Sequence, residues 1–143
     1  MVASLPTTGT VLIDTSAFFA TADLHDENHA AAGSTTMLIT RQRWRAATTN
    51  LILPETHALF LARYGRRTAL ERLRDIERST ITIVRVTQED EDQARKILST
   101  YDDKDFSLTD ATSFAVIERL RIAYAFTFDH NFVQYGIRTL SSR

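Results

Sequence analysis

The sequence predicts an α/β protein with a central parallel sheet of four to five strands, covered by helices on both faces. The first observation is an unbroken apolar run at residues 10–13, which follows turn-forming residues and ends at Asp14. A run without alternation is typical of a strand buried on both faces. The second observation is that such runs alternate with helical patterns along the chain, which indicates parallel strands joined by right-handed crossovers.

The individual elements follow from the spacing of apolar residues. Strands are predicted where a short β-branched or aromatic run is bounded by turn residues. After the first strand these are residues 44–49, 80–86, 123–128 and an edge strand at 137–140. Helices are predicted where apolar residues recur every three or four positions. They are residues 16–20, 29–41, 51–64, 66–78, 87–98 and 107–121, with a single turn at 130–135.

Polar residues at the helix starts predict the N-terminal caps, because their side chains accept hydrogen bonds from free backbone N–H groups. The expected caps, in chain order, are Thr15 or Ser16, Asp23 or Asp26, Asn50, Thr87 and Ser107. Gly65 is expected to end the helix that Asn50 begins. The helix after Ser107 is apolar on most sides, so we expect it to be packed centrally.

Composition excludes several classes of protein. The chain has 143 residues, 43% of them hydrophobic, which suits a single domain over residues 1–143 with its own core. It has no cysteine, so disulfides and thiolate metal sites are excluded. No apolar run is long enough for a signal peptide or a membrane span, and we therefore expect a soluble, cytoplasmic protein.

The net charge of -1 conceals an uneven distribution. Residues 41–78 carry nine arginines against four acids, whereas residues 86–110 carry eight acids against three basic residues. Each stretch can be a solvated helix face. The two together also fit an arginine-rich surface for phosphates beside an acidic site for a metal.

Four acids are placed to meet at one edge of the predicted sheet. Asp14 and Asp129 each end a strand, and parallel sheets bind ligands at the carboxyl ends of their strands. Glu55 lies near the start of a helix that follows a strand, which puts it at the same edge. Asp110 lies in the first turn of the helix after Ser107, and the sequence leaves the direction of that helix open.

Each acid also has a simpler explanation. Asp110 completes a capping box with Ser107, and Glu55 suits the positive end of a helix dipole. Asp14 and Asp129 suit turns that leave a strand. Four such coincidences favour a site, because clustered carboxylates repel one another unless a cation is bound. Oxygen ligands without cysteine select Mg²⁺ or Mn²⁺, and either ion suits phosphodiester chemistry.

Four segments carry a resemblance to a known family. They are VLIDTSA at 11–17, TTN at 48–50 continuing to Glu55, SLTDATSF at 107–114 and FTFDHNF at 126–132. In content and order they resemble PIN-domain nucleases, in the subgroup that includes VapC-type toxins. The resemblance implies a PIN-like three-layer α/β/α sandwich with an acidic Mg²⁺ or Mn²⁺ site.

The resemblance also implies roles for single residues. Asp14, Glu55, Asp110 and Asp129 match the catalytic acidic quartet, with Asp14 and Asp110 as direct metal ligands and the other two acting partly through water. The residues expected to support this quartet are Thr15, Ser16, Thr109 and Asn131. The residues that charge alone suggests for holding the RNA backbone are Arg41, Arg43 and Arg45.

The implied activity is metal-assisted hydrolysis of RNA to 5′-phosphate and 3′-hydroxyl ends. The implied partners are an RNA substrate, a cognate antitoxin protein and a second copy of the chain in a homodimer. An adjacent small open reading frame would favour the toxin function.

Three other functions stay open. The chain can be a PIN nuclease that processes RNA or cleaves DNA without an antitoxin. It can be a phosphotransfer or phosphatase protein, although a haloacid-dehalogenase-like site needs a second Asp where this chain has Ser16. It can be a non-catalytic RNA-binding module, and the complete acidic quartet argues against that function.

Overall fold

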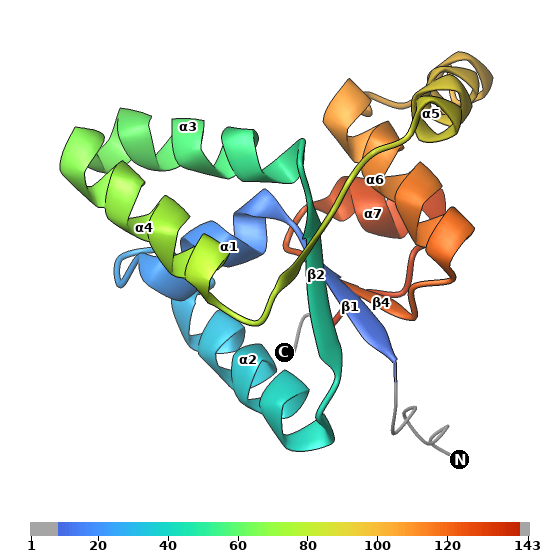
Figure 1. The fold of residues 1–143 in the computed structure, drawn as a ribbon. Coiled ribbons are helices and arrows are strands. Elements are labelled where there is room, and N and C mark those ends of the chain that lie inside the picture. The colour runs from blue at the N-terminus through green and yellow to red at the C-terminus, as the bar shows by residue number, and fades with distance from the viewer. Residues whose placement is uncertain (1–8, 141–143) are drawn as a thin grey trace.

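A parallel four-stranded sheet forms the centre of the computed structural model, which describes residues 9–140 (Figure 1). The strands are β1 (Thr10–Ile13), β2 (Arg45–Thr49), β3 (Thr82–Val84) and β4 (Tyr124–Phe126). Their order in the sheet is β3-β2-β1-β4, and every neighbouring pair is parallel. The predicted parallel sheet is therefore confirmed, with β1 at an interior position.

Helices cover both faces of this sheet. The helices are α1 (Thr15–Ala22), α2 (His29–Gln42), α3 (Ile52–Tyr64), α4 (Arg66–Arg78), α5 (Gln88–Thr100), α6 (Leu108–Leu120) and α7 (His130–Tyr135). Figure 1 shows α1 to α4 on one side of the sheet and α5 to α7 on the other. No helix within residues 9–140 is long and apolar enough to cross a membrane.

The packing of β1 explains its unbroken apolar run. Leu12 belongs to the core cluster built with α5, α6 and α7, whereas Val11 and Ile13 belong to the cluster built with α1 and α2. Successive side chains of a strand point to opposite faces, so both sets need an apolar neighbour. As expected, α6 is central, because seven consecutive residues from Ala111 to Ile117 are buried.

Three predicted strands differ from the structure. The strand predicted at 123–128 is shorter, because β4 covers only Tyr124–Phe126. The third strand is shorter than residues 80–86, because only Thr82–Val84 pair with β2. The predicted edge strand at 137–140 is not a strand. It makes one isolated parallel bridge between Ala125 and Thr139, although the backbone of Leu140 also donates to Ala125.

Three predicted caps also differ. Asn50 does not cap α3, which begins after Leu51, and the hydroxyl of Thr49 accepts from the backbone N–H groups of residues 51 and 52. The α1 and α2 helices begin after Asp14 and Asn28, and neither side chain caps its helix. The amide oxygen of Asn50 instead accepts from the backbone of Val86 at 2.7 Å, which ties the ends of β2 and β3 together.

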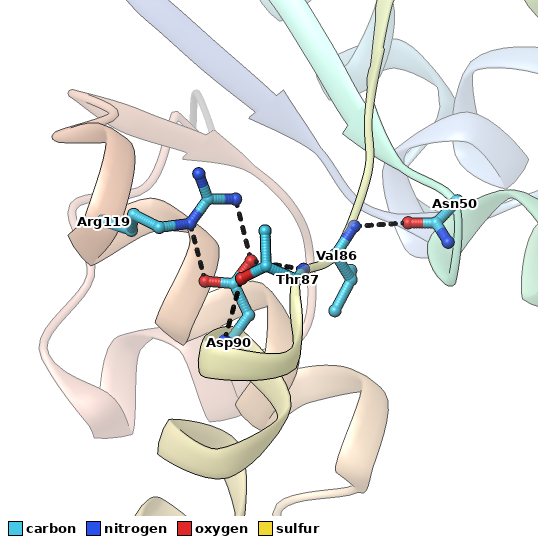
Figure 2. A network of polar contacts seen from close by, with 5 residues as sticks. All are labelled: Asn50, Val86, Thr87, Asp90 and Arg119. Atoms are coloured by element: carbon cyan, nitrogen blue, oxygen red, sulfur yellow. Dashed lines mark hydrogen bonds and ion pairs between the residues drawn. The ribbon is translucent and has the colours of Figure 1, made fainter.

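The predicted caps of α5 and α6 are confirmed. Thr87 with Asp90, and Ser107 with Asp110, form complete capping boxes. The carboxylate of Asp90 also accepts hydrogen bonds from Nε and Nη2 of Arg119, each at 2.8 Å (Figure 2). This pair locks α5 against α6, the helix that carries Asp110 (Figure 2).

Candidate active site

Asp14 is the most buried of the four carboxylates, with 4% of its surface exposed. It follows β1 directly and begins α1, so the sheet and the helix fix its backbone together. Its backbone N–H donates to the carbonyl of Phe126, at the end of β4. One oxygen, Oδ2, accepts hydrogen bonds from the hydroxyls of Ser16 at 3.1 Å and Thr127 at 3.0 Å.

The same two hydroxyls hold the loop that carries Asp129. Ser16 Oγ accepts the backbone N–H of Phe128 at 2.9 Å, and Thr127 Oγ1 accepts that of Asp129 at 2.9 Å. Each hydroxyl therefore donates to Asp14 and accepts from the loop. This arrangement fixes the separation of the two strand ends and ties the backbone of Asp129 to the hydroxyl that holds Asp14.

Glu55 is held from α1. The hydroxyl of Thr15 donates to Glu55 Oε1 at 2.6 Å and also lies 3.1 Å from the hydroxyl of Thr56. Pro54 is the third residue of α3, where a missing backbone N–H breaks no helical bond. The prolyl residue therefore does not displace Glu55 from the edge of the sheet.

Asp110 is held from α7. Its Oδ2 accepts from the side-chain amide of Asn131 at 3.0 Å and from the backbone of Ser107 at 3.1 Å. The backbone of Asn131 donates to Asp129 Oδ1 at 2.9 Å. A single residue, Asn131, thus positions the carboxylates of both Asp110 and Asp129. The structure also settles the direction of α6, whose N-terminus points to this edge.

The electrostatics of the site disfavour full ionisation. Burial raises the pKa of Asp14 to about 6; the hydrogen bonds from Thr127 and Ser16 limit the rise, and the charge of Glu55 adds to it. Burial also raises the pKa of Asp129, with the backbone of Asn131 opposing the rise and the charge of Asp110 adding to it. The carboxylates therefore interact as two neighbouring pairs, Asp14 with Glu55 and Asp110 with Asp129.

The side-chain chemistry of these residues suits a hard divalent cation. The available ligand atoms are carboxylate, hydroxyl or amide oxygens, and a cation would offset both the burial of charge and the smaller repulsion that raise the two pKa values. Within residues 9–140 no group of three or more acids or histidines is spaced to hold an ion by protein ligands alone. Mg²⁺ commonly keeps several waters and binds one or two carboxylates, so pairs of acids suit it better than a closed cage.

The structure does not bring the three predicted arginines to this site. Arg45 is the first residue of β2 and lies beside Thr10, at the opposite end of the strands from Asp14. Four residues of strand correspond to about 13 Å. Arg41 and Arg43 precede it at the end of α2. The three arginines therefore lie away from the four carboxylates, and their role in holding the RNA backbone stays a prediction.

Two threonines, Thr109 and Thr127, differ from the predicted set of residues that support the acids. Thr109 is half-buried beside Asp110, but no hydrogen bond links its hydroxyl to any of the four carboxylates in the described part of the chain. Sequence analysis missed Thr127, although it contacts Asp14 directly. The available signal was its position two residues before Asp129, where an alternating strand returns to the same face.

Comparisons with known proteins agree with this geometry. A family model described as PIN domain matches residues 11–137. The 23S rRNA-specific endonuclease VapC20 of Mycobacterium tuberculosis, from strains CDC 1551 and H37Rv, is 31% identical over 131 residues, which cover 88% of this chain and 94% of VapC20.

Solved structures show the same likeness. The crystal structure of Mycobacterium tuberculosis VapC20, described as a sarcin-ricin loop cleaving toxin, has a TM-score of 0.81 at 29% identity and covers 89% of this chain and 95% of that one. VapBC2 from Rickettsia felis, bound to a promoter DNA fragment, has a TM-score of 0.70 at 12% identity, with 91% and 96% covered. The second likeness is one of fold.

Proposed function

The chain belongs to the PIN-domain family, and on that premise we propose that it is a metal-dependent endoribonuclease, the toxin of a toxin–antitoxin pair. The observation that carries the proposal is the edge of the sheet at which Asp14, Glu55, Asp110 and Asp129 collect. Asp14, Glu55 and Asp110 each accept from a side chain of another element, and Asp129 accepts the backbone N–H of Asn131 in the helix that it caps. Such an arrangement fixes the carboxylates before a substrate binds.

The proposed cofactor is Mg²⁺ or Mn²⁺, held by Asp14 and Asp110 directly and by Asp129 and Glu55 partly through water. A divalent ion in this position would neutralise charge on the scissile phosphate and lower the pKa of the attacking water. The oxygen-only donors and the raised pKa of Asp14 support this choice.

The remaining residues would position these acids. Ser16 and Thr127 hold Asp14 in one rotamer, Thr15 holds Glu55, and Asn131 holds Asp110. No lysine, arginine or histidine within residues 9–140 forms an ion pair with any of the four. The carboxylates are therefore available to a cation, and the chain needs no nucleophile of its own for the hydrolysis.

The likeness to VapC20 supports ribosomal RNA as the first substrate to test. It also supports a cognate antitoxin as a partner, because VapC20 is described as a toxin. A homodimer is part of the same proposal. A PIN nuclease that acts on other RNA or on DNA without an antitoxin is the alternative that the experiment below separates.

The test is cleavage of an RNA pool that contains single-stranded, structured and ribosomal RNA, with Mg²⁺, with Mn²⁺ and with EDTA. We compare the wild-type protein with Asp110→Asn, and with Asp92→Asn as a control, since Asp92 is an exposed acid of α5. Metal-dependent cleavage that Asp110→Asn loses and Asp92→Asn keeps is the expected result. Thermal unfolding of Asp110→Asn checks that α6 keeps its cap.

Two outcomes would contradict parts of the proposal. Cleavage of DNA in preference to every RNA would favour the alternative nuclease. No cleavage and no metal binding would leave Asp110 as a helix cap only, and the protein as a binding module.

A further inference from the structure

A polar groove of about 380 Å³ lies along helix α1, next to the candidate active site. One wall consists of Ser16 and Phe19, which share one face of α1, and of Asp23, which directly follows that helix. Its wall on α3 consists of Leu59 and Arg63, which continue the face that begins at Glu55. Arg63 therefore lies about 12 Å along α3 from Glu55.

The groove is continuous with the candidate active site. Ser16 lines the groove, and its hydroxyl donates to Asp14 at 3.1 Å. Phe128 also lines it, donates its backbone N–H to the Ser16 hydroxyl and immediately precedes Asp129. A strand whose phosphate lies at the carboxylates would therefore place an adjoining nucleotide in the groove.

The far end of the groove is closed by an ordered turn between α1 and α2. The carboxylate of Asp23 accepts the backbone N–H of His25 at 2.9 Å, and that of Asp26 accepts the backbone N–H of Asn28 at 2.8 Å. The backbone of Asp26 donates in turn to the carbonyl of Asp23. These bonds fix the turn before any ligand binds, which lowers the entropic cost of binding.

Two polar side chains of the groove have no hydrogen-bond partner within residues 9–140, and a third, Arg63, keeps one face of its guanidinium exposed. No hydrogen bond is made by the side-chain amide of Asn28 or by the imidazole of His25. Arg63 has no ion pair in the described part of the chain. Its guanidinium lies over the ring of Phe19, 5.7 Å from the centroid. The opposite face of the guanidinium is free to stack, because Arg63 is exposed.

The balance of charge indicates a base rather than a second phosphate. Asp23 and Asp26 lie in the same groove as Arg63, so its positive charge is offset by two carboxylates. Proteins that read single-stranded RNA stack unpaired bases on aromatic rings or guanidinium planes and hydrogen-bond their edges. Arg63 and Phe128 supply such surfaces, while Asn28 supplies a donor and an acceptor and Asp26 an acceptor.

We propose that this groove is a subsite for one unpaired RNA base next to the scissile phosphate, stacked on Arg63 and read at its edge by Asn28 and Asp26. The subsite rests on the proposed function, because it takes RNA to be the substrate. Every RNA base carries an N–H or amino donor for Asp26, so the choice among bases comes from the added contact with the side-chain amide of Asn28. Recognition there makes cleavage depend on the base that flanks the cleaved bond.

The test is binding of four short single-stranded RNAs of equal length, one for each base, measured by fluorescence anisotropy. EDTA prevents cleavage, and low salt keeps backbone contacts strong. We expect the wild-type protein to prefer one RNA about tenfold, since a good pair of base contacts discriminates by that order. Asn28→Ala and Asp26→Asn should bring the four affinities within about twofold of one another. Arg63→Ala should weaken binding of all four RNAs, because stacking tolerates every base.

The controls separate the subsite from the fold and from the proposed function. Gln93→Ala removes an exposed amide on α5, and this variant should keep the base preference. Asp26→Asn keeps the side-chain oxygen that accepts the backbone N–H of Asn28, so the turn should stay in place. Equal or undetectable binding of all four RNAs by the wild type, or a preference that survives both variants, would overturn the subsite. Metal-dependent cleavage without a base preference would contradict the subsite and leave the proposed nuclease function standing. A base preference without cleavage would contradict the nuclease function and leave the subsite standing.

Discussion

The hydroxyl of Thr127 donates a 3.0 Å hydrogen bond to the carboxylate of Asp14, although 113 positions separate the two residues in the chain. The same hydroxyl accepts the backbone N–H of Asp129. Thr127 is itself buried, at the carboxyl end of β4. One side chain thus connects the acid after β1 with the acid after β4, and the geometry of the proposed metal site depends on it.

Replacing Thr127 with valine tests this connection. Valine keeps the shape of the side chain and removes both hydrogen bonds, so we expect a loss of about 1–3 kcal/mol of stability. The hydrogen bond from Thr127 lowers the pKa of Asp14, so its removal should raise that pKa further above about 6. The acidic limb of the cleavage rate should therefore move to higher pH, which a pH profile measures.

Thr127→Ser is the matched control, because serine keeps the hydroxyl. It should restore the wild-type pH profile even where it loses some stability through the missing methyl group. An unchanged profile in Thr127→Val would show that Thr127 contributes to packing only.

Much of the fold was predictable because the strands are short and the two that carry Asp14 and Asp129, β1 and β4, are buried on both faces. The run before Asp14 has no alternation, and the structure supplies the reason: Leu12 faces one helical layer, and Val11 faces the other. The structure of residues 137–140, which were predicted to form an edge strand, was not predictable in the same way. These residues pair at one position only, and the extent of pairing depends on the neighbouring strand rather than on local propensity.

The candidate site shows a similar division. Asp14 and Asp129 could be placed from the ends of their strands, since a parallel sheet aligns those ends. Arg45 was chosen for its charge alone, although its place at the start of the predicted strand 44–49 already puts it at the amino end, opposite Asp14. The direction of α6 also depended on tertiary contacts, among them the bond from Asn131 to Asp110.

Asp14→Asn should stabilise the metal-free protein at neutral pH. The folded-state pKa of Asp14, about 6, is above the ordinary value of 3.8, so the folded protein holds this proton more tightly than the unfolded chain. Ionisation of Asp14 therefore lowers stability as the pH rises from about 4 to 6, by on the order of 3 kcal/mol. The amide of asparagine does not titrate, so the stability of the variant relative to the wild type should increase as the pH rises through this range.

Thermal unfolding in EDTA between pH 4 and pH 8 measures this difference. Asp92→Asn, at an exposed position, should show a difference from wild type that does not change with pH. A constant difference for Asp14→Asn as well would contradict the raised pKa.

The pair between Asp90 and Arg119 should stabilise the α5–α6 layer. Burial alone would raise the pKa of Asp90, but hydrogen bonds from Arg119 and Thr87 lower it below its usual value. Only 2% of the Asp90 side chain is exposed, and Arg119→Ala leaves this carboxylate without its cation. We expect a loss of about 3 kcal/mol of stability. The bond from the backbone of Thr87 remains and limits the loss.

Arg119→Lys should lose less stability than Arg119→Ala, since lysine keeps the charge but not the two parallel bonds. Chemical denaturation measures both variants. Because the folded-state pKa of Asp90 is lowered, this stability is present above the ordinary pKa of the carboxyl and is lost as the pH falls through the folded value. Equal stability of wild type and Arg119→Ala at pH 7 would show that the exposed guanidinium contributes nothing.

Mg²⁺ or Mn²⁺ should raise the unfolding temperature of the wild-type protein, because an ion that binds only the folded chain stabilises it by mass action. At ten times the dissociation constant the gain is about 1.4 kcal/mol. The ion competes with protons for the carboxylates, so the gain should grow as the pH rises through about 6, the pKa of Asp14. Asp14→Asn should lose the gain at every pH, whereas Asp92→Asn should keep it. An equal gain in Asp14→Asn would place the bound ion away from β1, and the proposed role of Asp14 as a ligand would then be wrong.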